Sequence, residues 1–122
     1  MQEERVPTCR VEPSTSEDIA YILSVVRDEE SCHFAVRGGG HGTVPGASNV
    51  RGGITIDLTR LFFVELSPDQ TSVRVGGGAR WVDVYRKLDP LGLSMNGGRT
   101  AYLGVGGHTL GGLNYRKALD VH

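Results

Sequence analysis

The first third of the chain alternates apolar and polar residues in the pattern of a strand, a helix and a second strand. Residues 8–12 predict a short strand, which Pro13 ends because proline cannot donate a ladder hydrogen bond. Residues 32–37 predict the second strand, with a short apolar run bounded by turn-forming residues. Residues 8–37 therefore predict a β-α-β unit whose strands are parallel and joined by a right-handed crossover.

The helix between these strands is indicated by a stripe of apolar residues at helical spacing, namely Ile19, Ala20, Ile22, Leu23 and Val26. Ser14 and Glu17, three residues apart, form the pattern of a capping box, and Ser16 is the alternative N-cap. The run from Glu29 to Ser31 ends the helix.

The middle of the chain predicts further strands and one more helix. Residues 54–58 alternate as a strand, and residues 62–66 and 72–75 predict a hairpin. Residues 79–88 predict a helix with one apolar face, in which Trp81 is a core residue rather than a stacking platform for a ligand. The pattern as a whole predicts an α+β fold, with the β-α-β unit followed by a mixed sheet and a further helix.

Composition excludes several classes of protein. A chain of 122 residues is at most one domain. Its 13 basic and 14 acidic residues give a net charge of −1 without a basic run, which argues against nucleic acid or an anionic membrane as a partner. No apolar run is long enough for a membrane span, and residues 1–13 lack the apolar core of a signal peptide, so the sequence leaves the localisation open. The four histidines lack metal-ligand spacing, and no metal is predicted.

Fourteen of the 18 glycines gather in three tracts, at residues 38–42, 76–78 and 97–112. None fits the dinucleotide fingerprint or the phosphate-binding P-loop pattern. The first tract follows a predicted buried strand and carries His41, and it lies at the carboxyl end of that strand, where open α/β sheets usually bind ligands. Its glycine amides suit a bound anion, which makes it a candidate ligand cradle. The alternative is a tight surface turn with a solvated imidazole.

The order and spacing of these motifs resemble the FAD-linked oxidases of the vanillyl-alcohol-oxidase and berberine-bridge-enzyme type. The resemblance is to the PCMH-type FAD-binding domain, in particular the fungal branch of oxygen-dependent FAD-linked oxidoreductases. It covers roughly residues 6–113, nearly the whole chain. The matching segments are residues 37–42, 46–49, 52–61, 73–93 and 97–112.

The resemblance implies that FAD is the cofactor and that two loops bind it. The turn matching the FAD-pyrophosphate loop and the segment after it comprise Arg37, Gly38, Gly39, Gly40, His41, Gly42, Thr43 and Asn49. The second flavin loop comprises Gly104, Val105, Gly106, Gly107 and His108. His41 matches the histidine that is commonly bonded to the flavin 8α-methyl group. Thr100 stands where some members carry a second attachment cysteine, so bicovalent attachment is not expected.

Three polar or reactive positions admit alternatives. His108 is expected to be structural or flavin-adjacent rather than a proton shuttle. Asp57 either caps the end of its strand, the favoured interpretation, or is a buried partner for Arg37 or Arg60. If the first two strands are neighbours in register, Cys9 and Cys32 could come within the ~4.4–6.8 Å between Cα atoms that a disulfide needs. The alternative is two buried free thiols.

The resemblance implies an FAD-linked oxidoreductase that oxidises a small alcohol, sugar or secondary-metabolite substrate in a biosynthetic pathway. The expected organisation is an N-terminal tail at residues 1–6, the front part of the flavin domain at 7–113, and a divergent C-terminal tail at 114–122. The substrate domain of the family has no counterpart here, so the chain resembles a truncated member and its catalytic residues are unknown. The alternative is a catalytically silent remnant or binding module, and a separate chain completing the domain is a conceivable partner. Members of the family are often secreted.

Overall fold

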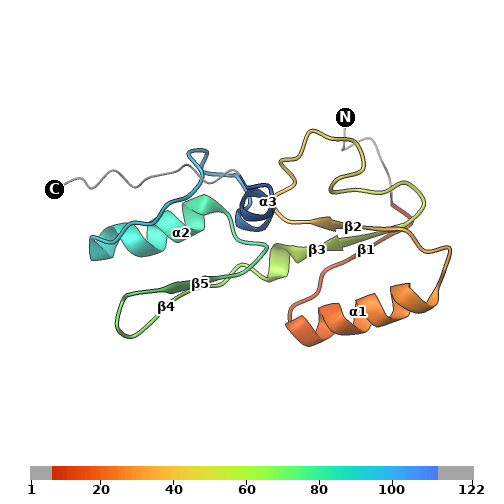
Figure 1. Cartoon of the computed structure of the whole chain (residues 1–122), viewed down its shortest axis with the longest axis horizontal. Helices are drawn as coiled ribbons and strands as arrows, with labels where there is room; N and C mark the ends of the chain where they lie inside the picture. Colours follow the sequence, from red (N-terminus) through yellow and green to blue (C-terminus); the bar gives the residue numbers. More distant parts are fainter. Residues whose placement is uncertain (1–6, 113–122) are drawn as a thin grey trace.

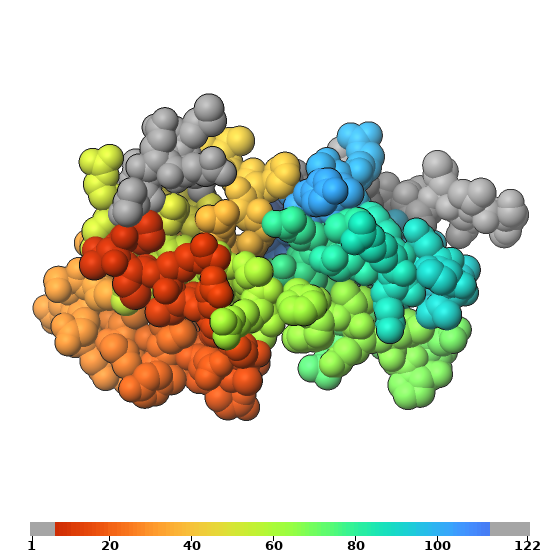
Figure 2. Space-filling view, turned by 180° about the vertical axis from the view of Figure 1, so that it is seen from behind, coloured from red at the N-terminus to blue at the C-terminus, as the bar shows by residue number. Residues whose placement is uncertain are grey.

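The computed structural model describes residues 7–112, which form two small α/β units side by side (Figure 1). The first unit contains the strands β1 (Cys9–Val11), β2 (Phe34–Arg37) and β3 (Ile54–Asp57), and the helix α1 (Ser16–Asp28) runs along one face of their sheet. Seen from behind, the two units form two lobes that meet at the middle of the molecule (Figure 2). The predicted α+β class is therefore observed, while the tails at 1–6 and 114–122 lie outside the described residues.

The second unit is a helix packed on a hairpin. The strands β4 (Val64–Leu66) and β5 (Val73–Val75) pair antiparallel, as residues 62–66 and 72–75 predicted. The helix α2 (Trp81–Leu88) buries one face, with its core residues Trp81, Val84 and Leu88 packed against both strands. These three residues recur at a spacing of three and four, which places them on one side of a helix. Trp81 is thus a core residue, as predicted.

The first sheet differs from the prediction in its strand order. It is a three-stranded parallel sheet in the order β1-β3-β2, so β3 lies between the two strands of the predicted β-α-β unit, and the adjacency that the disulfide required is absent. Thr55, Ile56 and Asp57 on β3 are at most 1% exposed. A strand buried to this degree gains most at the centre of a sheet, where both its edges are hydrogen-bonded. β3 therefore joins the β-α-β unit instead of forming a mixed sheet with the hairpin.

This order rules out the proposed disulfide. Cys9 pairs with Ile54, and Phe34 pairs with the same residue from the other side. Cys32 lies two residues before Phe34, so the two cysteines belong to chain segments on opposite sides of β3, about two strand spacings or 9–10 Å apart, which is more than a disulfide can span. Both cysteines are free, Cys9 being exposed and Cys32 partly buried.

Two short 3₁₀ helices follow β3 and α2. Residues Leu58–Arg60 form the 3₁₀ helix η2, and Asp89–Leu91 form η3 directly after α2. The third glycine tract, expected as a loop, contains the helix α3 (Val105–Leu110). Within residues 7–112, none of the helices has the length and apolar character that crossing a bilayer requires.

The N-cap of α1 lies one residue later than the first prediction. The Thr15 hydroxyl accepts a hydrogen bond from the Asp18 amide at 3.1 Å, and the Asp18 carboxylate accepts from the amides of Ser14 and Thr15 at 2.9 and 3.0 Å. The Asp18 carboxylate binds two amides at once in this position. The capping box therefore uses Thr15 and Asp18, not Ser14 and Glu17.

Thr15→Ala should lower the free energy of unfolding by about 1 kcal/mol, because it leaves an amide of the first helical turn without its partner. Ser14→Ala is the matched control, since only the backbone amide of Ser14 takes part in the cap, and it should change stability by less than about 0.5 kcal/mol. Urea denaturation followed by circular dichroism measures both values. Equal losses in the two variants would contradict the assigned cap.

Candidate cofactor-binding site

The three glycine tracts, far apart in the sequence, meet between the two units. A Cβ atom added to Gly39 would lie 2.5 Å from the amide nitrogen of Gly104, and one added to Gly106 would lie 2.8 Å from the carbonyl oxygen of Gly77. Both distances are shorter than real Cβ contacts allow. Backbone therefore packs directly on backbone at this junction, which requires glycine at positions 39, 104 and 106.

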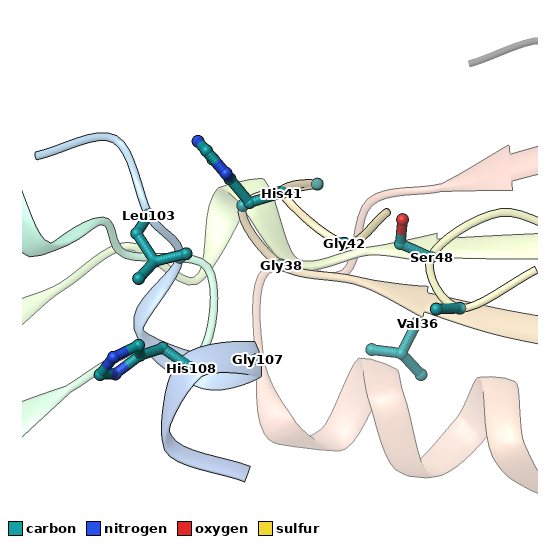
Figure 3. A pocket seen from close by; sticks show the side chains of 12 residues that line it. Val36, Gly38, His41, Gly42, Ser48, Leu103, Gly107 and His108 are labelled. Carbon is teal, nitrogen blue, oxygen red and sulfur yellow. The ribbon is translucent and has the colours of Figure 1, made fainter. Parts of the chain in front are cut away.

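A cavity of about 310 Å³ opens beside this junction (Figure 3). The first glycine turn forms one side of it, and the start of α3 with Leu103 forms another. None of the described residues that line it is acidic. The lining residues are Val36, Gly38, Gly39, Gly40, His41, Gly42, Ala47, Ser48, Leu103, Gly104, Gly107 and His108.

His41 stands at the rim of the cavity. Its side chain is exposed, and Figure 3 shows the ring projecting away from the backbone of the glycine turn. The preceding residue, Gly40, has φ +69°, a conformation that L side chains rarely adopt. The backbone of this turn is thus shaped so that the imidazole faces outward, within reach of a molecule in the cavity.

His108 has a different environment, although it also lines the cavity. It is 5% exposed, and its ring meets the edge of the Trp81 ring with 5.6 Å between centroids. The His108 Nδ1 and the Trp81 Nε1 are both buried and have no hydrogen-bond partner among the described residues. Its packing favours the predicted structural or flavin-adjacent role.

Asp57 lies beneath the first turn and combines the two roles that the sequence left open. Its Oδ1 accepts a hydrogen bond from the Thr59 amide at 2.9 Å and another from the Thr59 hydroxyl, so it caps η2 as predicted. Its Oδ2 also lies 3.1 Å from the Arg10 guanidinium and 3.7 Å from that of Arg37. The alternative partner, Arg60, pairs with Glu12 instead.

Part of the predicted site lines the cavity and part supports it. Asn49 accepts a hydrogen bond from the Thr55 hydroxyl at 2.6 Å, which ties the loop after the turn to the central strand. Four lining residues were missed by the sequence analysis: Val36, Ala47, Ser48 and Leu103. Ala47 and Ser48 belong to the 46–49 motif, and Leu103 directly precedes the third tract, so their position in the sequence could have indicated them. The predicted residues that do not line the cavity are Arg37, Thr43, Asn49, Val105 and Gly106.

These residues fit the diphosphate of a dinucleotide cofactor. Glycine amides without a Cβ permit close approach of phosphate oxygens, and the absence of a carboxylate in the described lining avoids repulsion. Val36 and Leu103 add apolar surface for a ring system. Among the described lining residues, only the exposed imidazole of His41 has an accessible ring nitrogen, because the ring of His108 is buried.

The family comparison agrees with this geometry. Residues 7–118 match the protein family described as FAD binding domain. The chain belongs to this family. Because the match covers nearly the whole chain, it confirms the predicted family and the predicted cofactor class, and it assigns the fold to the FAD-binding domain of flavin oxidases.

Curated relatives of this FAD-binding domain come from fungi. The FAD-dependent monooxygenase tpcD of Cochliobolus heterostrophus is 47% identical over 111 residues, a segment that covers 91% of this chain and 21% of that protein. The FAD-dependent monooxygenase FUP4 of Fusarium proliferatum is 41% identical over 106 residues, covering 87% and 20%. The chain thus spans about a fifth of the length of the curated relatives that it matches.

Among solved structures, glucooligosaccharide oxidase from Acremonium strictum superposes with a TM-score of 0.76 at 27% identity. The superposition covers 88% of this chain and 23% of that one. That enzyme is described as carrying a 6-S-cysteinyl, 8α-N1-histidyl FAD. The likeness confirms the fold class that the sequence predicted.

Proposed function

We propose that this chain is the FAD-binding part of a flavin-dependent oxidoreductase that oxidises a small alcohol, sugar or secondary-metabolite molecule. The observation that carries the proposal is the cavity beside the junction of the three glycine tracts, which the first and third tracts line and which has an exposed histidine at its rim. The names of the relatives support it, since monooxygenases and an oligosaccharide oxidase both perform flavin-dependent oxidation.

In this proposal each part of the cavity has its own role. The amides of residues 38–42 hold the diphosphate, while Val36 and Leu103 exclude water from apolar parts of the cofactor. His41 is the attachment point for covalent flavin, and Thr100 leaves a single attachment. FAD, when bound, supplies the hydride-accepting chemistry. The chain's own residues bind and orient it, and none of the described residues is assigned as catalytic.

Oxidation of a substrate also requires a base and a substrate pocket. The curated relatives are about five times as long as the segment that this chain matches. We propose that the base and the substrate pocket are supplied by the remaining part of such a protein, either in the same polypeptide or in a separate chain. The substrate is a small molecule.

FAD binding to the 122-residue chain tests the proposal directly. Titration with FAD, followed by flavin fluorescence, should show saturable binding that ADP reduces by competition. Ala47→Asp places a carboxylate in the cavity and should weaken binding about tenfold or more by repelling the diphosphate. Ala101→Asp, on an exposed alanine outside the cavity, is the matched control and should change affinity less than about twofold. Absence of saturable binding, or equal losses in both variants, would reject the proposed site.

A further inference from the structure

Five charged side chains form a continuous row of ion pairs at the carboxyl end of the parallel sheet. Arg60 lies 3.3 Å from Glu12, Glu12 lies 2.7 Å from Arg10, and Arg10 lies 3.1 Å from Asp57. Arg37 closes the row at 3.7 Å from Asp57. The row thus ends at the residue that opens the first glycine turn.

Asp57 is the most deeply buried member of this row, with 1% of its side chain exposed, whereas Glu12 is 36% exposed. Both of its oxygens are committed, Oδ1 to Thr59 and Oδ2 to the two arginines. A buried carboxylate held from both sides has little freedom to move, and removal of its charge leaves cationic partners without compensation. Asp57 therefore acts as a rigid anchor for the groups that contact it.

Arg37 connects Asp57 to the first glycine turn. It is the direct register partner of Asp57 across β2 and β3. Its guanidinium also lies against Gly40, where an added Cβ would be 3.0 Å from the Arg37 Nε and 3.1 Å from an Nη. The position of the guanidinium and the path of the turn backbone are thus mutually dependent, with Gly40 at φ +69° at the point of contact.

We propose that Asp57 is a positioning residue for the first glycine turn and acts through Arg37. By holding the guanidinium under Gly40, it sets the direction of the amides of residues 38–42. The inference rests on the proposed function, because those amides are the ones assigned to the FAD diphosphate. Asp57 itself does not line the cavity, so its effect on a bound cofactor would be exerted through Arg37 and the turn.

The chain offers a matched pair of variants. Asp57→Asn removes one charge from the row and the partner of Arg37, while the amide oxygen can still accept from Thr59. Glu12→Gln removes the same charge from the same row but leaves the contact between Asp57 and Arg37 intact. Asp57→Asn should weaken FAD binding about tenfold, and Glu12→Gln less than about twofold.

A double-mutant cycle separates positioning from general stability. In an Arg37→Gln background, Asp57→Asn should weaken FAD binding by less than a further factor of about two, because the residue through which it acts is gone. If Asp57→Asn weakened FAD binding equally with and without Arg37, or if Glu12→Gln had the same effect as Asp57→Asn, the proposal would be overturned.

A second measurement needs no cofactor and separates failure of this inference from failure of FAD binding. ¹⁵N relaxation of the FAD-free chain reports the mobility of the amides of residues 38–42. Asp57→Asn and Arg37→Gln should both lower the heteronuclear NOE of these amides, and Glu12→Gln should leave it unchanged. Arg37→Gln alone decides the matter if Asp57→Asn does not fold. An unchanged turn in Arg37→Gln would overturn the inference, whether or not the chain binds FAD.

Discussion

Replacing His41 by alanine should remove every flavin that the chain holds covalently. His41 is exposed at the rim of the cavity, where a neutral imidazole can act as a nucleophile toward an activated methyl group. The other lining histidine, His108, is buried with its ring against Trp81. Neither cysteine lines the cavity, and Thr100 offers no thiol. We therefore propose His41 as the attachment point of covalent flavin.

The measurement is fluorescence that survives acid precipitation of protein produced with FAD. His33→Ala is the matched control, because His33 is also exposed but does not line the cavity, and it should retain the acid-stable signal. His41→Ala should still bind FAD reversibly, since the glycine turn is intact. Acid-stable flavin in His41→Ala would show that another residue carries the bond.

Gly104→Ala should lower the free energy of unfolding by about 2–3 kcal/mol, within the usual range for overpacking a tightly packed site. Its new Cβ would meet the amide nitrogen of Gly39 and lie 2.7 Å from the Gly39 Cα. Both atoms belong to backbone, which cannot rotate away as a flexible side chain can. The substitution should force the two glycine tracts apart and open the junction between the units.

Gly107→Ala is the control for this substitution. It lies three residues further along the same tract, inside α3, and an added Cβ would meet nothing within 4 Å. Alanine has the better helix propensity, so this variant should be neutral or more stable by up to about 1 kcal/mol. Urea denaturation of both variants gives the comparison. A Gly104→Ala protein as stable as Gly107→Ala would show that the tracts do not pack as described.

The sequence by itself determined the local elements of this protein. The spacing of Trp81, Val84 and Leu88 predicted α2, and the alternation on either side of a polar turn predicted the β4–β5 hairpin, because helical and extended periodicity are properties of neighbouring residues. The glycine turn with His41 was also visible, since a run of glycines after an apolar strand is a local signal. The order of the motifs was sufficient to indicate the FAD-binding family and its cofactor.

Only the tertiary structure decided which of these elements lie next to one another. β3 enters between β1 and β2, which separates Cys9 from Cys32 and brings Arg10 and Arg37 to the two sides of Asp57. Strand order depends on how much surface the whole sheet buries. That burial depends on residues far apart in the sequence, so a short segment cannot indicate it. The contact of Gly39 with Gly104 is equally non-local. The site therefore exists only after chain segments more than sixty residues apart have packed together, although each of them was recognisable alone.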